Sequence, residues 1–269
     1  MIKMAVSSNS EFIDFIVPLG DRMRLYDPTK EPTDQTRNDA ADPTKALPHG
    51  FIDAMIVREE VFVKEQNIPL ANELDEDDHR SFHWVAYASV PAKATQKHDE
   101  KLGETRRESN STKIPIGVIR LVPPPHPPHP SGKYGSDVHN AKECYIKLGR
   151  LAVVKEFRKA GISSLLINTA LAFARNHPYE LMPQHDAMQT MRQEVDRGVE
   201  MDFKGLVLVH AQTGVQKVWR RFGFETDESM GKWDEEGIEH VGMWKRMDVS
   251  SGRRKSKAFL GVTNPSNVD

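Results

Sequence analysis

A strand pattern that runs through a short glycine-containing turn into an amphipathic helix restricts the fold of this chain most. The strand is predicted over residues 145–154 and the helix over residues 162–175. The turn between them reads Arg158-Lys159-Ala160-Gly161-Ile162-Ser163. A helix N-terminus carries unpaired N–H groups and a partial positive charge, so this turn is suited to hold a diphosphate. On these residues alone, a purely structural turn is an equally good interpretation.

The rest of the chain alternates between patterned and loose stretches, which predicts a mixed α/β fold. Helices are expected over residues 51–66 and 212–222, and strands over residues 83–90, 114–122, 205–211 and 240–247. The chain has 269 residues, 38% of them hydrophobic, which is enough for a well-formed core.

We therefore expect one α/β (α+β) domain over residues 1–249. It would hold a mixed, mostly antiparallel, splayed sheet of about six to seven strands with helices on both faces. Long irregular insertions are expected at about residues 18–50, 92–113, 123–142 and 176–204, and a flexible basic and polar tail at residues 250–269.

Charge and cysteine content exclude several classes of protein. Lysine and arginine total 37 and aspartate and glutamate total 39, so the net charge is −2, and binding to nucleic acid or to an anionic membrane is not expected. The single cysteine, Cys144, allows no internal disulfide and no zinc site built on paired cysteines.

No apolar run approaches the roughly 20 residues of a membrane-spanning helix. We expect a cytoplasmic protein, and the basic cluster at residues 253–257 leaves a nuclear location open.

The proline-rich stretch at residues 123–130 contains His126 and His129, and His139 follows it. Such a stretch favours polyproline II over helix or central strand. The stretch is stiff and contains no acidic or cysteine partner for its histidines, so we expect an exposed loop without a metal ion. Docking of a protein partner on this loop stays open.

The turn also resembles motif A of the GCN5-related N-acetyltransferases (GNATs), in which Gln/Arg-x-x-Gly-x-Gly/Ala holds the pyrophosphate of acetyl-CoA. Here the pattern falls on Arg158-x-x-Gly161-x-Ser163, with serine in place of the usual glycine or alanine. The resemblance implies that Arg158, Lys159, Ala160, Gly161, Ile162 and Ser163 bind acetyl-CoA. It also implies that Leu151, Ala152 and Val153 pair with the pantetheine arm, on a strand splayed from its neighbour at residues 205–211.

A second segment, residues 212–224, resembles the family pattern Asn-x-x-Ala-x-x-x-Tyr-x-x-x-Gly-Phe. Gln212 stands at the asparagine position and Trp219 at the tyrosine position, and both are expected at the cofactor site. In the family that tyrosine often protonates the departing CoA thiolate. Tryptophan cannot do so, because its indole N–H does not ionise usefully. Either the thiolate leaves unassisted, or water or another group protonates it, or the activity is lost.

A third resemblance is to the ElaA/YjcF-like members of the family. It rests on residues 58–66, 73–78, His83, 150–153, 211–212 and 237–240. In all, the resemblance covers about residues 51–91, 114–122, 143–175 and 205–247.

Direct transfer to an amine needs a group that takes the amine's proton. The strand position that carries a glutamate in some family members is Leu148 here, which cannot serve. His210 and Asp75 are the first two candidates, and Glu143 and Glu73 come after them. For the acidic segment at residues 73–78, a solvated turn and a surface that attracts a cationic amine are the alternatives.

The sequence thus predicts an acetyl-CoA-dependent N-acetyltransferase that acts by direct attack in a ternary complex. The acceptor is open between a small cationic amine or amino sugar, which the acidic segment favours, and a protein amine. Transfer of another acyl group stays open, because motif A contacts only the CoA moiety. The alternative from another class is a non-catalytic acyl-CoA-binding or interaction protein, and a homodimer is also open.

Overall fold

The computed structural model describes residues 12–35, 46–91, 111–129, 135–182, 198 and 202–249. Within these residues the strands form one sheet of eight strands in the order β1-β2-β3-β4-β5-β8-β6, with β7 also paired to β8. The strands are β1 (Ile13–Ile16), β2 (Phe82–Pro91), β3 (Ser111–Val122), β4 (Tyr145–Val153), β5 (Leu206–Gln212), β6 (Glu225–Thr226), β7 (Lys232–Glu235) and β8 (Ile238–Arg246).

All the pairings are antiparallel except the one between β4 and β5. The expected mixed, mostly antiparallel sheet is confirmed, with one strand more than the upper expected number. The short strands β1, β6 and β7 were not expected, because two to four residues carry too little alternation to be distinguished from loop.

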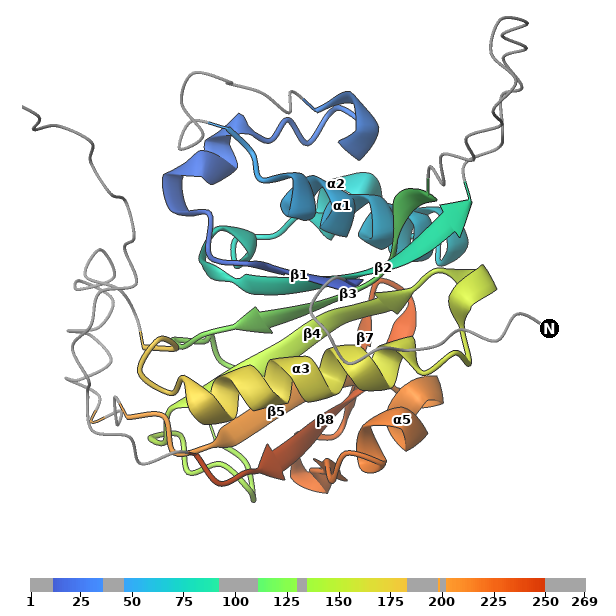
Figure 1. Cartoon of the computed structure of the whole chain (residues 1–269). Coiled ribbons are helices and arrows are strands. Elements are labelled where there is room, and N and C mark those ends of the chain that lie inside the picture. Colours follow the sequence, from blue (N-terminus) through green and yellow to red (C-terminus); the bar gives the residue numbers. More distant parts are fainter. Residues whose placement is uncertain are drawn as a thin grey trace, which may run out of the picture.

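Helices cover both faces of the sheet, as expected (Figure 1). On one face lie α1 (His49–Arg58), the π-helix Glu59–Glu65 that continues it, and α2 (Leu70–Glu73). On the other lie α3 (Ile162–Asn176) and α5 (Gln216–Arg220). Each face has its own core, one gathered around Phe51 of α1 and one around Leu166 of α3. No described helix is long and apolar enough to cross a membrane.

The strand β4 changes its pairing on both sides near its middle. Its parallel pairing with β5 ends at Leu148, opposite Val209. On the β3 side, Gly149 pairs with Arg120 and Ala152 with Val118, so β4 carries one extra residue there. This is a β-bulge, and Arg150 within it has a positive φ of 49°, a backbone conformation that is strained for arginine. Beyond Leu148, β4 and β5 therefore diverge, as the expected splay requires.

The predicted elements shift mostly at their ends. The helix expected over residues 51–66 divides into α1 and the π-helix, and the helix expected over residues 212–222 shortens to a 3₁₀ turn at Thr213–Val215 followed by α5. The region 18–50, expected to be irregular, holds 3₁₀ turns at Gly20–Leu25 and Pro32–Asp34. The tail at residues 250–269 and most of the insertions expected at 92–113 and 176–204 lie outside the described residues.

Gly205, just before β5, supplies a test of this sheet. It has a φ of 90°, and a Cβ there would collide with the carbonyl oxygen of Met247. We expect Gly205→Ala to lower the free energy of unfolding by more than about 2 kcal/mol, since it adds a steric conflict to the backbone strain. Gly231→Ala is the control, because Gly231 has a φ of 69° and open space around it. Equal losses in urea unfolding would contradict the prediction.

Candidate functional site

A cavity of about 990 Å³ opens where β4 and β5 diverge. It extends between the splayed strands, the N-terminus of α3, the end of the π-helix and the β7–β8 turn. Of the residues predicted for the site, the cavity is lined by Asp75, Leu151, Ala152, Val153, Arg158, Lys159, Gly161, Ile162, Ser163, His210, Gln212 and Trp219. Ala160 is not among its lining residues. The structure thus brings together residues that are up to 144 positions apart in the chain.

The turn before α3 has the backbone shape of an anion cradle. Gly161 is the N-cap residue of α3 with a φ of 83°, and its side-chain position is open space. Lys159 also has a positive φ, 66°. No side chain caps the helix, so the N–H groups of its first turn remain available to a ligand. A diphosphate fits this cradle, because it needs converging N–H groups and room at Gly161.

Two contacts from the end of the π-helix cross the cavity's mouth. Arg158 donates two hydrogen bonds to the Glu65 carboxylate, at 2.6 and 2.5 Å, and one to the carbonyl oxygen of Val153. Gln212 Nε2 donates to Gln66 Oε1 at 3.0 Å. Arg158 is therefore held by a carboxylate beside the cradle, a partner that the sequence analysis did not foresee.

Trp219 lies on α5 with its side chain almost completely buried. Its ring packs edge-on against Phe224, with 5.2 Å between the ring centroids, and it forms part of the cavity wall. Trp219 can fill space against a ligand there, but it offers only an N–H donor and no titratable proton.

His210 is held by a carboxylate that the sequence analysis missed. Its Nδ1 donates to Glu235 Oε1 at 3.2 Å, and Trp233 Nε1 donates to the same oxygen at 2.6 Å. Burial would raise the pKa of Glu235, but the hydrogen bonds from His210 and Trp233 and the charges of His210 and His240 together outweigh it and lower that pKa to about 2. An ionised carboxylate only accepts hydrogen bonds, so the proton of neutral His210 sits on Nδ1 and its Nε2 carries a lone pair.

The environment of His210 keeps the imidazole neutral. Burial lowers the pKa of His210 to about 4, even though Glu235 favours the charged ring. Among the described residues, Nε2 has no hydrogen-bond partner. His210 and Glu235 form an acid–histidine pair of the type that orients a general base.

Three arginines and three carboxylates form a buried network beside the cavity: Arg58, Arg120, Arg150, Glu73, Asp75 and Asp78. Arg58 is fully buried and donates to Glu73 Oε1 at 2.5 Å and to both oxygens of Asp78 at 2.6 and 3.0 Å. Burial would raise the pKa of Asp78, but Arg58 and Arg120 hold it well below its ordinary value. The network ties α1, the 73–78 segment, β3 and the bulge of β4 together.

The expectation of a solvated acidic turn at residues 73–78 is wrong for Glu73 and Asp78, which are only 2% and 0% exposed. Asp75 lies at the cavity, where it accepts hydrogen bonds from Arg120 at 2.6 and 2.7 Å and from Arg150 at 3.0 Å. Burial alone would raise the pKa of Asp75, but these arginines lower it. A lowered pKa weakens Asp75 as a proton acceptor, and its catalytic role stays a prediction.

The proline-rich loop is less exposed than expected. His126 and His129 are half-buried, and His139 is only 5% exposed. His139 stacks on Trp244, and His129 packs edge-on against Trp233. These histidines pack over the sheet beside β5, and in the described part of the chain no group of three or more metal-ligating side chains forms.

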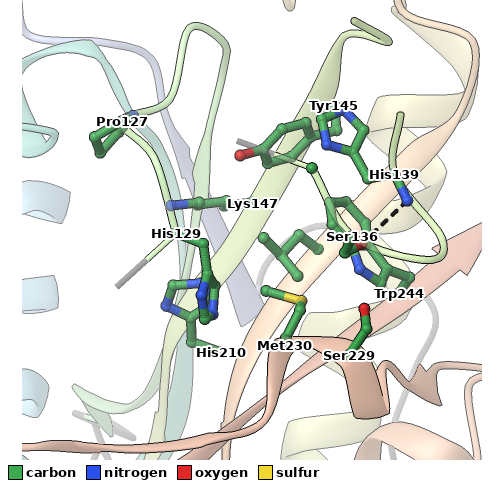
Figure 2. Close-up of a pocket in the computed structure, with 12 residues that line it drawn as sticks. Pro127, His129, Ser136, His139, Tyr145, Lys147, His210, Ser229, Met230 and Trp244 are labelled. Atoms are coloured by element: carbon green, nitrogen blue, oxygen red, sulfur yellow. Dashed lines mark hydrogen bonds between the residues drawn. The ribbon is translucent and has the colours of Figure 1, made fainter. Parts of the chain in front are cut away.

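A second, small pocket of about 20 Å³ lies under this loop and adjoins the large cavity (Figure 2). Lys147 and His210 line both spaces. In Figure 2, Lys147, His129 and His210 lie together on one side of the pocket, and His139, Tyr145 and Trp244 lie on the other. Glu143, a later candidate for the base, instead forms an ion pair with Arg246 and lines neither space.

Two residues that the sequence analysis passed over carry signals that could have found them. Lys147 is a charged residue between the apolar residues Ile146 and Leu148, and strand alternation directs it to the opposite face. Glu235 precedes the Glu236-Gly237 turn, and residues on both sides of that turn alternate as a hairpin would. By contrast, nothing local predicts that Glu235 reaches His210.

Arg58→Met tests the network. It leaves two buried carboxylates without their main partner, so we expect the free energy of unfolding at pH 7 to fall by about 3–5 kcal/mol. The control is Arg24, an exposed residue that pairs with the equally exposed Asp21, and Arg24→Met should leave stability nearly unchanged.

The pH dependence of this loss is a second readout. The pKa values of Asp75 and Asp78 are lower in the folded than in the unfolded chain, so their contribution is complete above about pH 4 and disappears at lower pH. The difference between wild type and Arg58→Met in urea unfolding should therefore shrink below about pH 4. A small, pH-independent difference would contradict the network's role.

Comparisons with known proteins identify the family of this chain. Residues 59–193 match the sequence model of the Acetyltransferase (GNAT) family. The chain is 31% identical over 115 residues to the uncharacterized N-acetyltransferase YjcF of Bacillus subtilis, which is 43% of this chain and 53% of that protein, so it spans about half the length of this curated relative.

Solved structures with a similar arrangement include Escherichia coli ElaA, at 17% identity over 74% of this chain and 93% of that one, with a TM-score of 0.39. An acyl-CoA N-acyltransferase from Pseudomonas aeruginosa is 19% identical over 87% of this chain and 99% of that one, with a TM-score of 0.42. Because the family model covers just over half of the sequence, this chain belongs to the GNAT acetyltransferase family.

Proposed function

We propose that this chain is an acetyl-CoA-dependent N-acetyltransferase that transfers the acetyl group directly to a primary amine in a ternary complex. The observation that supports this most is a single cavity whose lining includes both an anion cradle, at Gly161 and Ser163, and an oriented histidine, His210. The cradle suits the CoA diphosphate, and His210 suits the proton transfer that amide formation requires. We assign this activity to one domain over residues 1–249.

Bound acetyl-CoA supplies the acetyl group as an activated thioester. The first turn of α3 would hold its diphosphate, with Lys159 adding positive charge. The edge of β4 at Leu151, Ala152 and Val153 has no partner on the β5 side, so its backbone groups can pair with the amide-containing pantetheine arm. Backbone N–H groups of this stretch that point away from β3 would stabilise negative charge on a carbonyl oxygen.

His210 is the base in this proposal. The Nε2 lone pair is available across the neutral pH range because the pKa of His210 is about 4. Such a weak base does not deprotonate a free ammonium group with a pKa of about 10.4. It is suited to an amine that arrives neutral and becomes strongly acidic as its nitrogen bonds to carbon. Glu235 keeps the imidazole in the tautomer that this step needs.

The position at which the family often has a tyrosine to protonate the departing thiolate is Trp219 here. Trp219 forms part of the cavity wall, and its indole N–H cannot act as an acid. A thiol pKa of about 8.5 lets water supply the proton near neutral pH. The same substitution supports the second candidate, an acyl-CoA-binding protein without turnover, which would bind acetyl-CoA through the same cradle.

The acidic segment gives less support to a cationic amine than its sequence implies, because three arginines engage its carboxylates at residues 73, 75 and 78, and Arg80 engages Asp77. A small-molecule amine remains our proposal over a protein amine. His210 and Lys147 line the cavity itself, so the acceptor would bind inside it rather than on an open surface, which suits a small molecule.

Acetyl-CoA should raise the midpoint of thermal unfolding of the wild-type protein by several degrees at about 100 times its dissociation constant. Gly161→Asp should abolish this rise, since it places a negative charge in the cradle and strains a positive-φ position. Gly20→Asp is the matched control, because Gly20 also has a positive φ of 55° and open space around it. No rise in the wild type would refute the proposed function.

His210→Gln and Glu235→Gln test the proton transfer in a screen of amines that detects the free CoA thiol. We expect His210→Gln to lower kcat by about 10²–10⁴-fold. Glu235→Gln should lower kcat less. It removes the carboxylate that selects the Nδ1–H tautomer of His210, but it leaves the imidazole in place. The rise in unfolding midpoint with acetyl-CoA should persist in both variants. Binding of acetyl-CoA without turnover of any amine by the wild type would favour the second candidate.

A further inference from the structure

Lys147 is a cation in the acceptor part of the cavity that the proposed function does not use. It lies on β4 and pairs with Leu208 of the neighbouring strand β5. His210 is two residues after Leu208 on β5. Ile146 and Leu148 are buried on the α3 face, so Lys147 projects from the other face, where it lines both the cavity and the small pocket beneath the proline-rich loop. Figure 2 shows its side chain beside His129 and His210.

The nearby carboxylates are already engaged by other groups. Asp77 pairs with Arg80 at 2.6 Å, Glu235 accepts from His210 and Trp233, and Asp75 is held by two arginines. Within the residues that the structure describes, Lys147 forms no ion pair within 4.0 Å and no hydrogen bond.

An unpaired cation at a half-buried position is costly. Burial lowers the pKa of Lys147, and the more distant Asp77 and Glu235 do not offset that effect. A ligand that brings a negative charge to this point removes the cost, because it supplies the missing counter-ion. The described residues form a cation site without its anion, next to the oriented histidine.

We propose that the acceptor is an amine that also carries a carboxylate, and that the Lys147 ammonium pairs with that carboxylate. This inference rests on the proposed function and names the class of its acceptor as an amino acid. A phosphate-bearing amine fits less well, because a phosphate carries a charge of about −1.5 to −2 and a single lysine would leave it undercompensated beside Glu235.

The spacing of the site favours an α- or β-amino acid. Lys147 and His210 lie on neighbouring strands and line the same pocket of about 20 Å³. An amine beside His210 and a carboxylate at Lys147 are thus separated by only a few bonds. The positive charge of Lys147 also disfavours the ammonium form of the acceptor, and a neutral amine is what the attack requires.

The test compares acceptors that differ only in the anionic group. The panel holds α-amino acids and β-alanine, each beside its carboxamide, with O-phosphoethanolamine as the phosphate counterpart. CoA thiol release gives kcat/KM for each. We expect the acids to exceed their carboxamides by about tenfold or more, since a buried charged partner discriminates strongly against an acceptor that lacks the group. Carboxamides that match or exceed the acids, or preference for O-phosphoethanolamine over β-alanine, would overturn the proposal.

Lys147→Met should bring the ratio of acid to carboxamide close to one. Lys142→Met is the matched control, because Lys142 is an exposed lysine shortly before the same strand, and the ratio should not change. Acetyl-CoA should still raise the unfolding midpoint of Lys147→Met, which shows that the variant folds. Equal losses for acids and carboxamides in Lys147→Met would show a structural role and overturn the proposal.

A binding measurement separates this inference from the proposed function. The thermal unfolding midpoint is measured with the same panel, with and without CoA. Carboxylates should raise the midpoint of the wild type and of Lys142→Met but not that of Lys147→Met. If no carboxylate raises the wild-type midpoint, the Lys147 inference fails even where acetyl-CoA binds. If acetyl-CoA does not bind, the acetyltransferase proposal fails, while the carboxylate result still decides the role of Lys147.

Discussion

The salt-bridge network around Arg58 is the interaction on which the arrangement of this site depends. A guanidinium with no solvent exposure is tolerable only when its nitrogens find hydrogen-bond partners, and here Glu73 and Asp78 accept from all three of them. The bonds fix the 73–78 segment against α1, and Asp75 then reaches Arg120 and Arg150. The three positive and three negative charges of this cluster balance. The cluster therefore adds no net charge to the cavity beside it.

The network also explains how a strained strand can persist. Arg150 has a positive φ at the β-bulge of β4, which costs free energy for a residue with a Cβ. Its guanidinium is within ion-pair distance of Glu73 and Asp75, so the tertiary structure compensates for the local strain. The bulge in turn lets β4 leave β5 after Leu148 and opens the cavity. Charge pairing on one face thus supports the splay at which ligands can bind.

The parts of the site that the sequence predicted are those built from contiguous residues. The strand, the turn at Gly161 and the helix after it follow from local periodicity and from one positive-φ position. The errors concern residues whose surroundings come from distant segments. Glu73 and Asp78 look like a solvated acidic turn until Arg58, fifteen and twenty positions earlier, is placed between them. The proline-rich loop looks exposed until Trp233 and Trp244 pack against its histidines.

The sequence by itself determined the family, the order of the main elements and the glycine turn before α3, because each rests on residue types at fixed short spacing. Only the tertiary structure decided which charges cancel, which histidine is oriented, and which cation has no partner among the described residues. Glu235 reaches His210 across a hairpin, and Lys147 is left between carboxylates that other residues engage. Electrostatic energies depend on distance and burial in three dimensions, and a linear sequence specifies neither.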